Sequence, residues 1–174
     1  PAPAWVEKNL AAIGRISGGD VATARALLDE SEEERPALPG RRGDQPFSDF
    51  RDFDDVFSGV AEMVFQGKYT WFPLEQARSL EPNAPRKLRD LIWPGARITA
   101  DDGTSGDVFL FALYPGSAAH ADDLVKLGRM TDWKSLSDEL QAGQGLRSYL
   151  VDDEEISLFE LGPVEFDAPE GEPS

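Results

Sequence analysis

The spacing of apolar residues changes once along the chain, and this change limits the fold more than any other feature. In the first 34 residues, two sets of apolar residues recur at helical spacing, namely Val6, Leu10 and Ile13, and then Val21, Ala24 and Leu28. From residue 47 onward, short apolar or alternating runs are separated by turn residues, a pattern typical of antiparallel strands. The sequence therefore predicts an α+β chain, with a short helical hairpin followed by a small, mainly antiparallel β domain.

The helical hairpin is predicted to occupy residues 1–35. Residues 17–20 supply the break between its helices, with Asp20 or Gly19 placed to cap the second helix and Pro36 just beyond its end. A pair of short helices buries only one face on its own. We therefore expect it to pack on the following domain or on further helices.

The rest of the chain is divided by its proline, glycine and acidic residues. Residues 36–46 combine three prolines with two glycines, which predicts a linker lying over the surface. Residues 47–166 are predicted to form the β domain, and residues 167–174 an acidic, disordered tail.

Three hairpins are predicted within the β domain, because in each case two apolar runs flank a turn sequence. The paired runs are 61–65 with 69–72, 98–100 with 108–111, and 147–151 with 156–161. Short helices are expected at 86–92 and 121–127. Five to seven strands in all would suit a small SH3-like barrel.

Charge limits the possible partners. Seventeen basic residues against 33 acidic ones give a formal net charge of −16, so the average surface repels nucleic acid and anionic lipid. The chain has no cysteine, which excludes a disulfide framework and suits a reducing compartment. Without a signal sequence or a long apolar run, the sequence predicts a cytoplasmic protein that contacts neither nucleic acid nor a membrane.

The sequence offers no convincing catalytic, cofactor-binding or metal-binding residues. His120 is the only histidine, and Ser117 and Asp122 lie near it only along the chain, which does not make a catalytic triad. One histidine without cysteine cannot supply a usual zinc or iron site, and the acidic hairpin tip at 101–107 lacks the register of a calcium loop. We therefore expect no enzyme activity and no cofactor.

The aromatic residues of the β domain suggest a different kind of site. Most of them should fill the core. Trp93 and Tyr114 each precede a proline, and together they would suit a groove that receives a peptide.

Three stretches resemble the ImpE family of bacterial type VI secretion, whose members are also called TagJ or SciE-type proteins. Residues 67–75 read GKYTWFPLE, residues 88–94 read LRDLIWP, and residues 114–117 read YPGS, in the order and at the spacing of the family. The similarity extends from the helical pair to about residue 166. The family usually carries more N-terminal helices of tetratricopeptide-like character, so the resemblance implies that this chain starts at their last pair.

The resemblance also implies a function. Members of the family are accessory proteins whose helical region engages the N-terminal helix of the small sheath subunit (TssB-like), and the sheath-disassembling AAA+ ATPase (ClpV-like) is a further implied partner. On this basis we expect a non-enzymatic, cytoplasmic interaction protein. The two helical rows, which contain Val6, Leu10, Ile13, Val21, Ala24 and Leu28, would offer a groove for the partner helix.

Alternatives to these expectations remain open. The apolar rows of the two helices could be buried entirely by packing on the β domain, which would leave no groove for a partner. The chain could also be a peptide-binding β module unrelated to secretion, or a hydrolase, which would show a polar cleft with coupled carboxyl groups of raised pKa.

Overall fold

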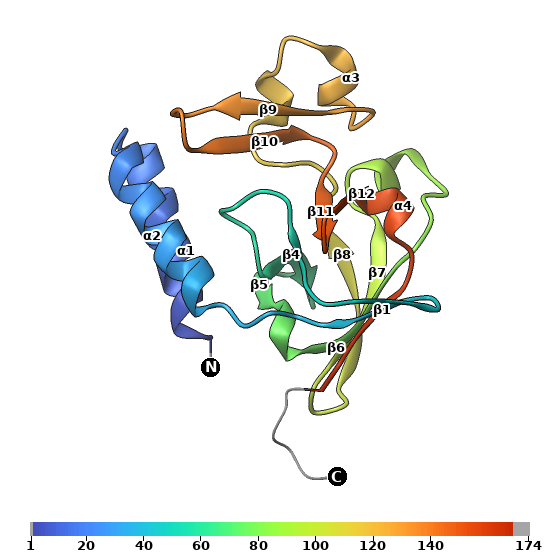
Figure 1. Ribbon diagram of the computed structural model, residues 1–174. Coiled ribbons are helices and arrows are strands. Elements are labelled where there is room, and N and C mark those ends of the chain that lie inside the picture. The colour runs from blue at the N-terminus through green and yellow to red at the C-terminus, as the bar shows by residue number, and fades with distance from the viewer. Residues whose placement is uncertain (1, 169–174) are drawn as a thin grey trace.

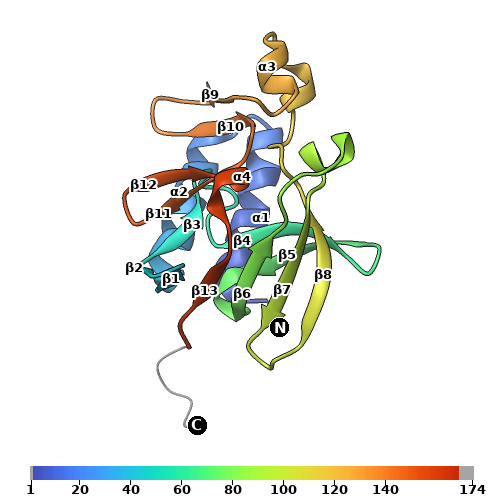
Figure 2. The ribbon, with the colours of Figure 1, turned by 90° about the vertical axis from the view of Figure 1, so that its right-hand side faces the viewer.

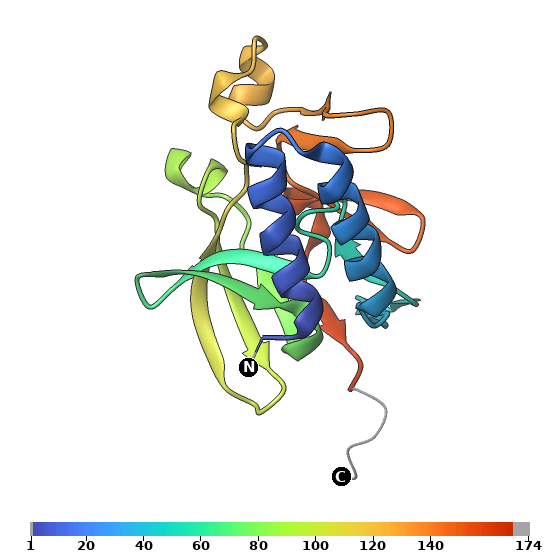
Figure 3. The same cartoon turned by 90° about the vertical axis from the view of Figure 1, so that its left-hand side faces the viewer.

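The N-terminal part of the structure, a computed structural model that describes residues 2–168, is a pair of helices. Helix α1 (Ala4–Ser17) and helix α2 (Val21–Glu34) run side by side in opposite directions (Figure 3). The Asp20 carboxylate accepts a hydrogen bond from Thr23 N at 3.2 Å, which caps α2 as expected. The chain turns to an extended conformation at Arg35, directly before Pro36, and this ends the helix.

An antiparallel sheet forms most of the remainder (Figures 1 and 2). It has eight strands in the order β2-β1-β13-β6-β7-β8-β4-β5. These strands are β1 (Gly40–Arg42), β2 (Gln45–Phe47), β4 (Val60–Phe65), β5 (Lys68–Pro73), β6 (Ala77–Pro82), β7 (Gly95–Ala100), β8 (Ser105–Leu110) and β13 (Val164–Phe166).

Two smaller sheets and several short helices complete the described chain. One sheet joins β9 (Thr131–Ser135) to β10 (Gln141–Gly145), and the other has the order β12-β11-β3. The strands of the second sheet are β3 (Phe50–Asp52), β11 (Ser148–Val151) and β12 (Glu154–Ser157). The short helices are η1 (Leu74–Gln76), η2 (Leu88–Leu91), η3 (Ser117–Ala119), α3 (Asp123–Lys126) and α4 (Leu158–Leu161).

The expected class, two helices followed by a mainly antiparallel β part, is confirmed. The turns at Gln66-Gly67 and Asp102-Gly103 join β4 to β5 and β7 to β8, as their sequences predict. Gln66 and Gly67 both have positive φ, 49° and 76°, which a two-residue hairpin turn of this kind requires.

The segment 36–46, expected to be a surface linker, is partly built into the sheet, through residues 40–42 and 45–46. Strand β1 pairs with β2 on one side and with β13 on the other. Leu38 is buried in the core, and Leu38 N donates a hydrogen bond of 2.9 Å to Asp49 Oδ1. The prolines of this segment, Pro36, Pro39 and Pro46, all lie outside residues 40–42. The backbone N–H groups of residues 40–42 are therefore available for strand pairing, although the segment as a whole is rich in proline.

Two further expectations about the β part differ from the structure. Within residues 2–168 there are thirteen short strands in three sheets, whereas five to seven were expected. The second run of the third hairpin, 156–161, is a strand only as far as Ser157 and continues as α4. Of the expected disordered tail, residues 169–174 lie outside the described residues.

The core has two parts. The larger part lies on the sheets and includes Phe50, Leu80 and Tyr149. The second part lies where the helical pair meets the β residues, and it joins Trp5, Val6, Ala12, Ala24 and Leu28 to Val56, Phe57, Val60, Tyr114 and Leu140. The inner face of the helical pair is therefore a structural part of the β domain's core.

Candidate functional site

The turn that contains η2 projects between β6 and β7, and one carboxylate shapes it. Asp90 accepts hydrogen bonds from Arg86 N at 2.9 Å and from Lys87 N at 3.0 Å. These hydrogen bonds, the one from Arg86 above all, hold the pKa of Asp90 below its ordinary value. The carboxylate is thus occupied by the backbone, and the side chains of Arg86 and Arg89 are left to face outward.

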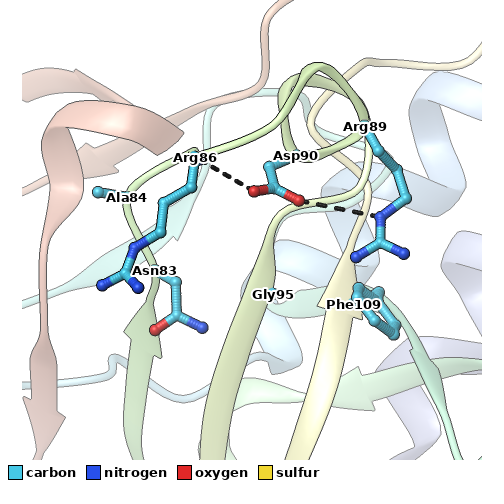
Figure 4. Close-up of a pocket in the computed structure, with 7 residues that line it drawn as sticks. All are labelled: Asn83, Ala84, Arg86, Arg89, Asp90, Gly95 and Phe109. Carbon is cyan, nitrogen blue, oxygen red and sulfur yellow. Dashed lines mark hydrogen bonds and ion pairs between the residues drawn. The ribbon is translucent and has the colours of Figure 1, made fainter.

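A polar pocket of about 330 Å³ opens beside this turn (Figure 4). It is lined by Asn83, Ala84, Arg86, Arg89, Asp90, Gly95 and Phe109. The Arg89 guanidinium carbon lies 5.3 Å from the centre of the Phe109 ring, a cation–π arrangement, and Arg89 Nε lies 3.9 Å from Asp90 Oδ1. No ion pair is made by the Arg86 side chain with any residue of the described part of the chain.

An apolar pocket of about 230 Å³ adjoins the polar one and shares Arg89 and Phe109 with it. Its other lining residues are Val64 and Trp93. Trp93 is 45% exposed and Phe109 43% exposed, a high exposure for large aromatic side chains. We call the residues that line the two pockets the η2 groove. It has a cationic half and an apolar half.

A second hollow, of about 170 Å³, lies between the end of α1 and the β9–β10 hairpin. We call it the α1 notch, and it is lined by Ile13, Ile16, Ser17, Asp54, Val56, Phe57, Pro115, Leu136, Ala142 and Gly143. Most of these residues are apolar. Beside the notch, a further hollow between α2 and the hairpin is lined by Asp138, Glu139 and the Arg25–Asp29 ion pair among others, so acidic side chains outnumber basic ones there.

Asp54 is the one acidic side chain in the lining of the α1 notch. It is 3% exposed, and burial together with the nearby charge of Asp52 raises its pKa to about 6. Its two oxygens accept hydrogen bonds from Val56 N at 2.9 Å and Gly143 N at 2.7 Å. Asp54 therefore ties the loop after β3 to strand β10.

Below the surface, Arg147 connects three parts of the fold. Its guanidinium donates to Asp52 Oδ2 at 2.7 Å, to Glu62 Oε2 at 2.6 Å and to the Phe111 carbonyl at 3.0 Å. Burial disfavours its charge, but the charges around it, that of Asp52 first, outweigh burial and raise its pKa above the ordinary value. Each of the three guanidinium nitrogens has an acceptor, so this network connects β3 and β4 to the residue directly before β11.

The helical rows predicted as a partner groove are only partly accessible. Val6, Ala24 and Leu28 are at most 4% exposed, because the helical pair uses them to pack on the β residues. The expectation that these three residues line a partner groove is therefore wrong. For them the alternative holds, in which the apolar rows pack on the β domain. Leu10 is 52% exposed, and Ile13 and Val21 are half-buried. Ile13 also lines the α1 notch.

The two aromatic residues predicted to form a peptide groove do not meet at the surface. Tyr114 is 1% exposed, and its hydroxyl donates to Asp52 Oδ1 at 2.7 Å in the network around Arg147. Trp93 lies in the η2 groove instead. Tyr114 is large and carries a polar tip, which allows it to fill the core and still satisfy its hydroxyl.

The residues examined for catalysis and metal binding do not assemble into a site. His120 Nε2 lies 3.0 Å from Asp132 Oδ2, whereas the Ser117 hydroxyl donates to the Tyr114 carbonyl and accepts from Gly145 N. No group of three histidine or acidic side chains within residues 2–168 is placed to hold a metal ion. Among the same residues, no helix is long and apolar enough to span a bilayer.

Sequence reasoning missed several residues of these sites. Arg86, Arg89 and Phe109 were not singled out, although LRDLIWP, which includes Arg89, had been noted as a family motif. Nothing in the sequence indicates that Arg147 is buried, because a single arginine before an apolar strand is usually a surface residue.

Comparisons with known proteins agree with one another. The sequence profile of the ImpE family, described as "ImpE protein", matches residues 44–165. The type VI secretion system accessory component TagJ of Pseudomonas aeruginosa is 36% identical over 163 residues, which cover 94% of this chain and 57% of that protein. The crystal structure of protein VPA1032 from Vibrio parahaemolyticus superposes with a TM-score of 0.87 at 26% identity, covering 95% of this chain and 62% of that one.

This chain thus spans about three fifths of the length of these two relatives. The family profile covers the β part from β2 to β13, and the relatives also match the helical pair. From its sequence and its structure, the chain belongs to the ImpE family.

Proposed function

We propose that this chain acts in type VI secretion as a non-enzymatic, cytoplasmic accessory protein that works by binding segments of other proteins. The observation that carries the proposal is the 36% identity to the accessory component TagJ across 94% of the chain. The surface supports a binding role, because large apolar side chains such as Leu88, Trp93 and Phe109 are exposed.

The proposed partner is the N-terminal helix of the small sheath subunit, and the proposed site is the α1 notch. An amphipathic helix would place one bulky apolar side chain against Ile13, Ile16 and Leu136. This placement replaces the groove between the helical rows, whose central residues are buried.

Charge favours a partner helix with lysine or arginine on its polar face. Two hollows next to α2 carry more carboxylates than arginines, because Arg25 and Arg51 pair with Asp29, Asp55 and Glu32 and leave Glu33, Asp138 and Glu139 in the linings without a cationic partner among the described residues. Basic side chains at the rim of the docked helix would be attracted to these carboxylates, and added salt would weaken that attraction.

Three finer points belong to the same proposal. The sheath-disassembling ATPase is a further partner, α1 and α2 form the last pair of a tetratricopeptide-like region, and the β part is related to SH3-like barrels. They rest on the family resemblance of the three motifs.

The hydrolase alternative has one observation in its favour, namely the raised pKa of Asp54 beside Asp52. Against it, Asp52 is completely buried, and both oxygens of Asp54 accept backbone hydrogen bonds. A carboxyl group held in this way supports the loop that it caps, and we favour binding over catalysis.

Calorimetric titration with a peptide copying the sheath subunit's N-terminal helix tests the proposal. Ile13→Ser should weaken binding about tenfold, the usual effect of truncating a central apolar contact. Leu10→Ser is the matched control on α1, because Leu10 is exposed and does not line the notch. Circular dichroism should show that both variants remain folded.

Three outcomes would contradict parts of the proposal. If Leu10→Ser abolishes binding and Ile13→Ser does not, the helix lies on the outer face of the helical pair. If TagJ of P. aeruginosa binds the peptide and this chain does not, the site lies in the part of TagJ that this chain does not match. If neither binds at about 1 mM peptide, where an interaction of about −4 kcal/mol is detectable, the sheath helix is not the partner.

A further inference from the structure

The η2 groove lies on a different side of the molecule from the helical pair. In Figure 1, α1 and α2 stand at the left, and the light green η2 turn stands at the right, beyond the strands of the large sheet. The groove shares no lining residue with the α1 notch. A ligand bound there would therefore use residues that the proposed helix site does not use.

The first observation that points to a ligand is the charge of the groove. The chain has a net charge of −16, yet the η2 turn presents Arg86, Lys87 and Arg89 within four positions. Asp90, the acidic residue among them, is engaged by two backbone N–H groups and lies 3.9 Å from Arg89. Among the described residues the Arg86 guanidinium makes no ion pair, and the Arg89 guanidinium has only the long contact with Asp90, so the groove offers one unpaired and one weakly paired guanidinium to a carboxylate.

The second observation is the apolar half of the same groove. Val64, Trp93 and Phe109 line a pocket with Arg89 at its edge, and the adjoining polar pocket begins at the same arginine. Arg89 lies over the Phe109 ring, which fixes its position between the two halves. A bulky apolar side chain and a carboxylate from one short segment would then lie in adjacent pockets.

We propose that the η2 groove is a second binding site, which takes an acidic peptide segment with a bulky apolar residue next to one or more carboxylates. Arg86 and Arg89 bind the carboxylates, and Val64, Trp93 and Phe109 receive the apolar side chain. The segment belongs to another protein, and its charge is opposite to that expected of the helix for the α1 notch.

Charge also argues against other anionic ligands. A nucleic acid or an anionic membrane would bring many negative charges close to a chain of −16, and its repulsion would extend beyond this one groove. A short segment with two or three carboxylates limits that repulsion to the groove, where the cationic side chains are. The apolar half has no role in binding a phosphate backbone, but it matches a leucine or phenylalanine side chain.

The proposal does not depend on the identity of the sheath helix, because it concerns separate residues. Its test is a titration of the ¹⁵N-labelled chain with the N-acetylated peptide Gly-Asp-Glu-Leu-Phe-Asp-Glu-Gly, followed by backbone amide shifts. We expect shifts at residues 83–95 and around Phe109, with the amides of α1 and α2 unchanged. A control peptide carries asparagine and glutamine in place of the acidic residues and should bind at least about tenfold more weakly, because a charge-assisted hydrogen bond is lost with each carboxylate.

Variants then separate the two halves of the groove. Arg86→Gln with Arg89→Gln should reduce affinity for the acidic peptide about tenfold or more, and Phe109→Ser should weaken both peptides. Arg97→Gln is the matched control, because Arg97 is an exposed arginine on the adjacent strand β7 and lines neither pocket. It should bind like the unaltered chain.

Several results would overturn the proposal. It is wrong if 1 mM acidic peptide causes no shifts in the groove, if the shifts fall on α1 and α2, or if the double arginine variant binds as well as Arg97→Gln does. It is also wrong if a single-stranded DNA 12-mer displaces the peptide, or if the groove amides shift with protein concentration alone, since a second copy would then occupy the site.

Discussion

Arg147 carries a full charge in the interior of the molecule, at 2% exposure, and its surroundings account for it. Asp52 and Glu62 receive its hydrogen bonds, and the rings of Phe57 and Tyr114 lie 4.5 and 4.8 Å from its guanidinium carbon. A buried ion pair of this kind adds little to stability compared with apolar residues of the same size, but the loss of one partner leaves the others without compensation.

Arg147→Ala should therefore destabilise the fold by about 3–5 kcal/mol, because Asp52 and Glu62 would remain buried without a counter-charge. Denaturant unfolding measures the loss. Arg97→Ala removes an exposed arginine and should change the free energy of unfolding by less than about 0.5 kcal/mol. Equal effects of the two substitutions would contradict the role assigned to Arg147.

Asp54 predicts a dependence of stability on pH that differs from that of a salt-bridged carboxylate. Its pKa of about 6 in the folded chain lies above the ordinary value of 3.8, so the folded state holds this proton more tightly than the unfolded state does. The contribution of Asp54 to the free energy of unfolding should thus fall by about 3 kcal/mol as pH rises from about 4 to above 6.

Asp54→Asn tests this dependence, because asparagine does not titrate. At pH 4 the variant should be less stable than the unaltered chain by about 1–3 kcal/mol, since one of the two backbone N–H groups loses its acceptor. As pH rises to 7, the difference should move in favour of the variant by about 3 kcal/mol. A difference in unfolding free energy that stays constant between pH 4 and pH 7 would show that Asp54 ionises normally.

At the scale of elements, the segment around β1 depends on a glycine. A Cβ atom at Gly40 would overlap the Glu165 carbonyl oxygen and come within 2.9 Å of the Phe47 ring, so the backbones of β1 and β13 approach closely there. A surface linker would place no such demand on this residue.

Gly40→Ala should accordingly destabilise the chain by about 1–3 kcal/mol, as overpacking does. Gly14→Ala is the control in α1, where an added Cβ meets nothing within 4 Å, and it should stabilise by about 0.5–1 kcal/mol. Thermal unfolding of both variants measures the two effects. If Gly40→Ala leaves the thermal stability unchanged, the close approach of β1 and β13 is contradicted and the segment behaves as a linker.

Local signals in the sequence account for the elements that were predicted, and long-range pairing accounts for those that were missed. The helical pair and the hairpins β4–β5 and β7–β8 depend on periodicity, an Asp20 cap and turn glycines, all of which are readable in a short window. Strand β1 pairs with β13, which lies more than 120 residues away. A short sequence window shows only the prolines and glycines in and around β1, and these indicate a linker. The helical turn α4 likewise follows a strand without an intervening break.

In the candidate sites, too, the features that were missed depend on contacts between residues far apart in the sequence. Trp93, named with Tyr114 as a candidate for a peptide groove because it precedes Pro94, is 45% exposed. The burial of Tyr114 depends on Asp52, 62 positions away, and the contact of Arg89 with Phe109 joins η2 to strand β8. Neither contact can be derived from spacing along the chain.

At the scale of the whole molecule, two surfaces differ in charge. The hollows around α2 are lined by more carboxylates than arginines, whereas the η2 groove has two arginines and one carboxylate beside exposed aromatic rings. Because the two proposed sites share no lining residue, the two proposals together predict that the chain binds two different segments at once.

The central claim is that this member of the ImpE family binds a basic amphipathic helix through the α1 notch. The most direct measurement is a titration of the ¹⁵N-labelled chain with the sheath subunit's N-terminal helix, with backbone amide shifts mapped on the structure. We predict shifts at Ile13, Ile16, Leu136 and Ala142, and none at Arg86 or Trp93. The claim is contradicted if, at about 1 mM peptide, no amide shifts or the notch amides stay unchanged while others move.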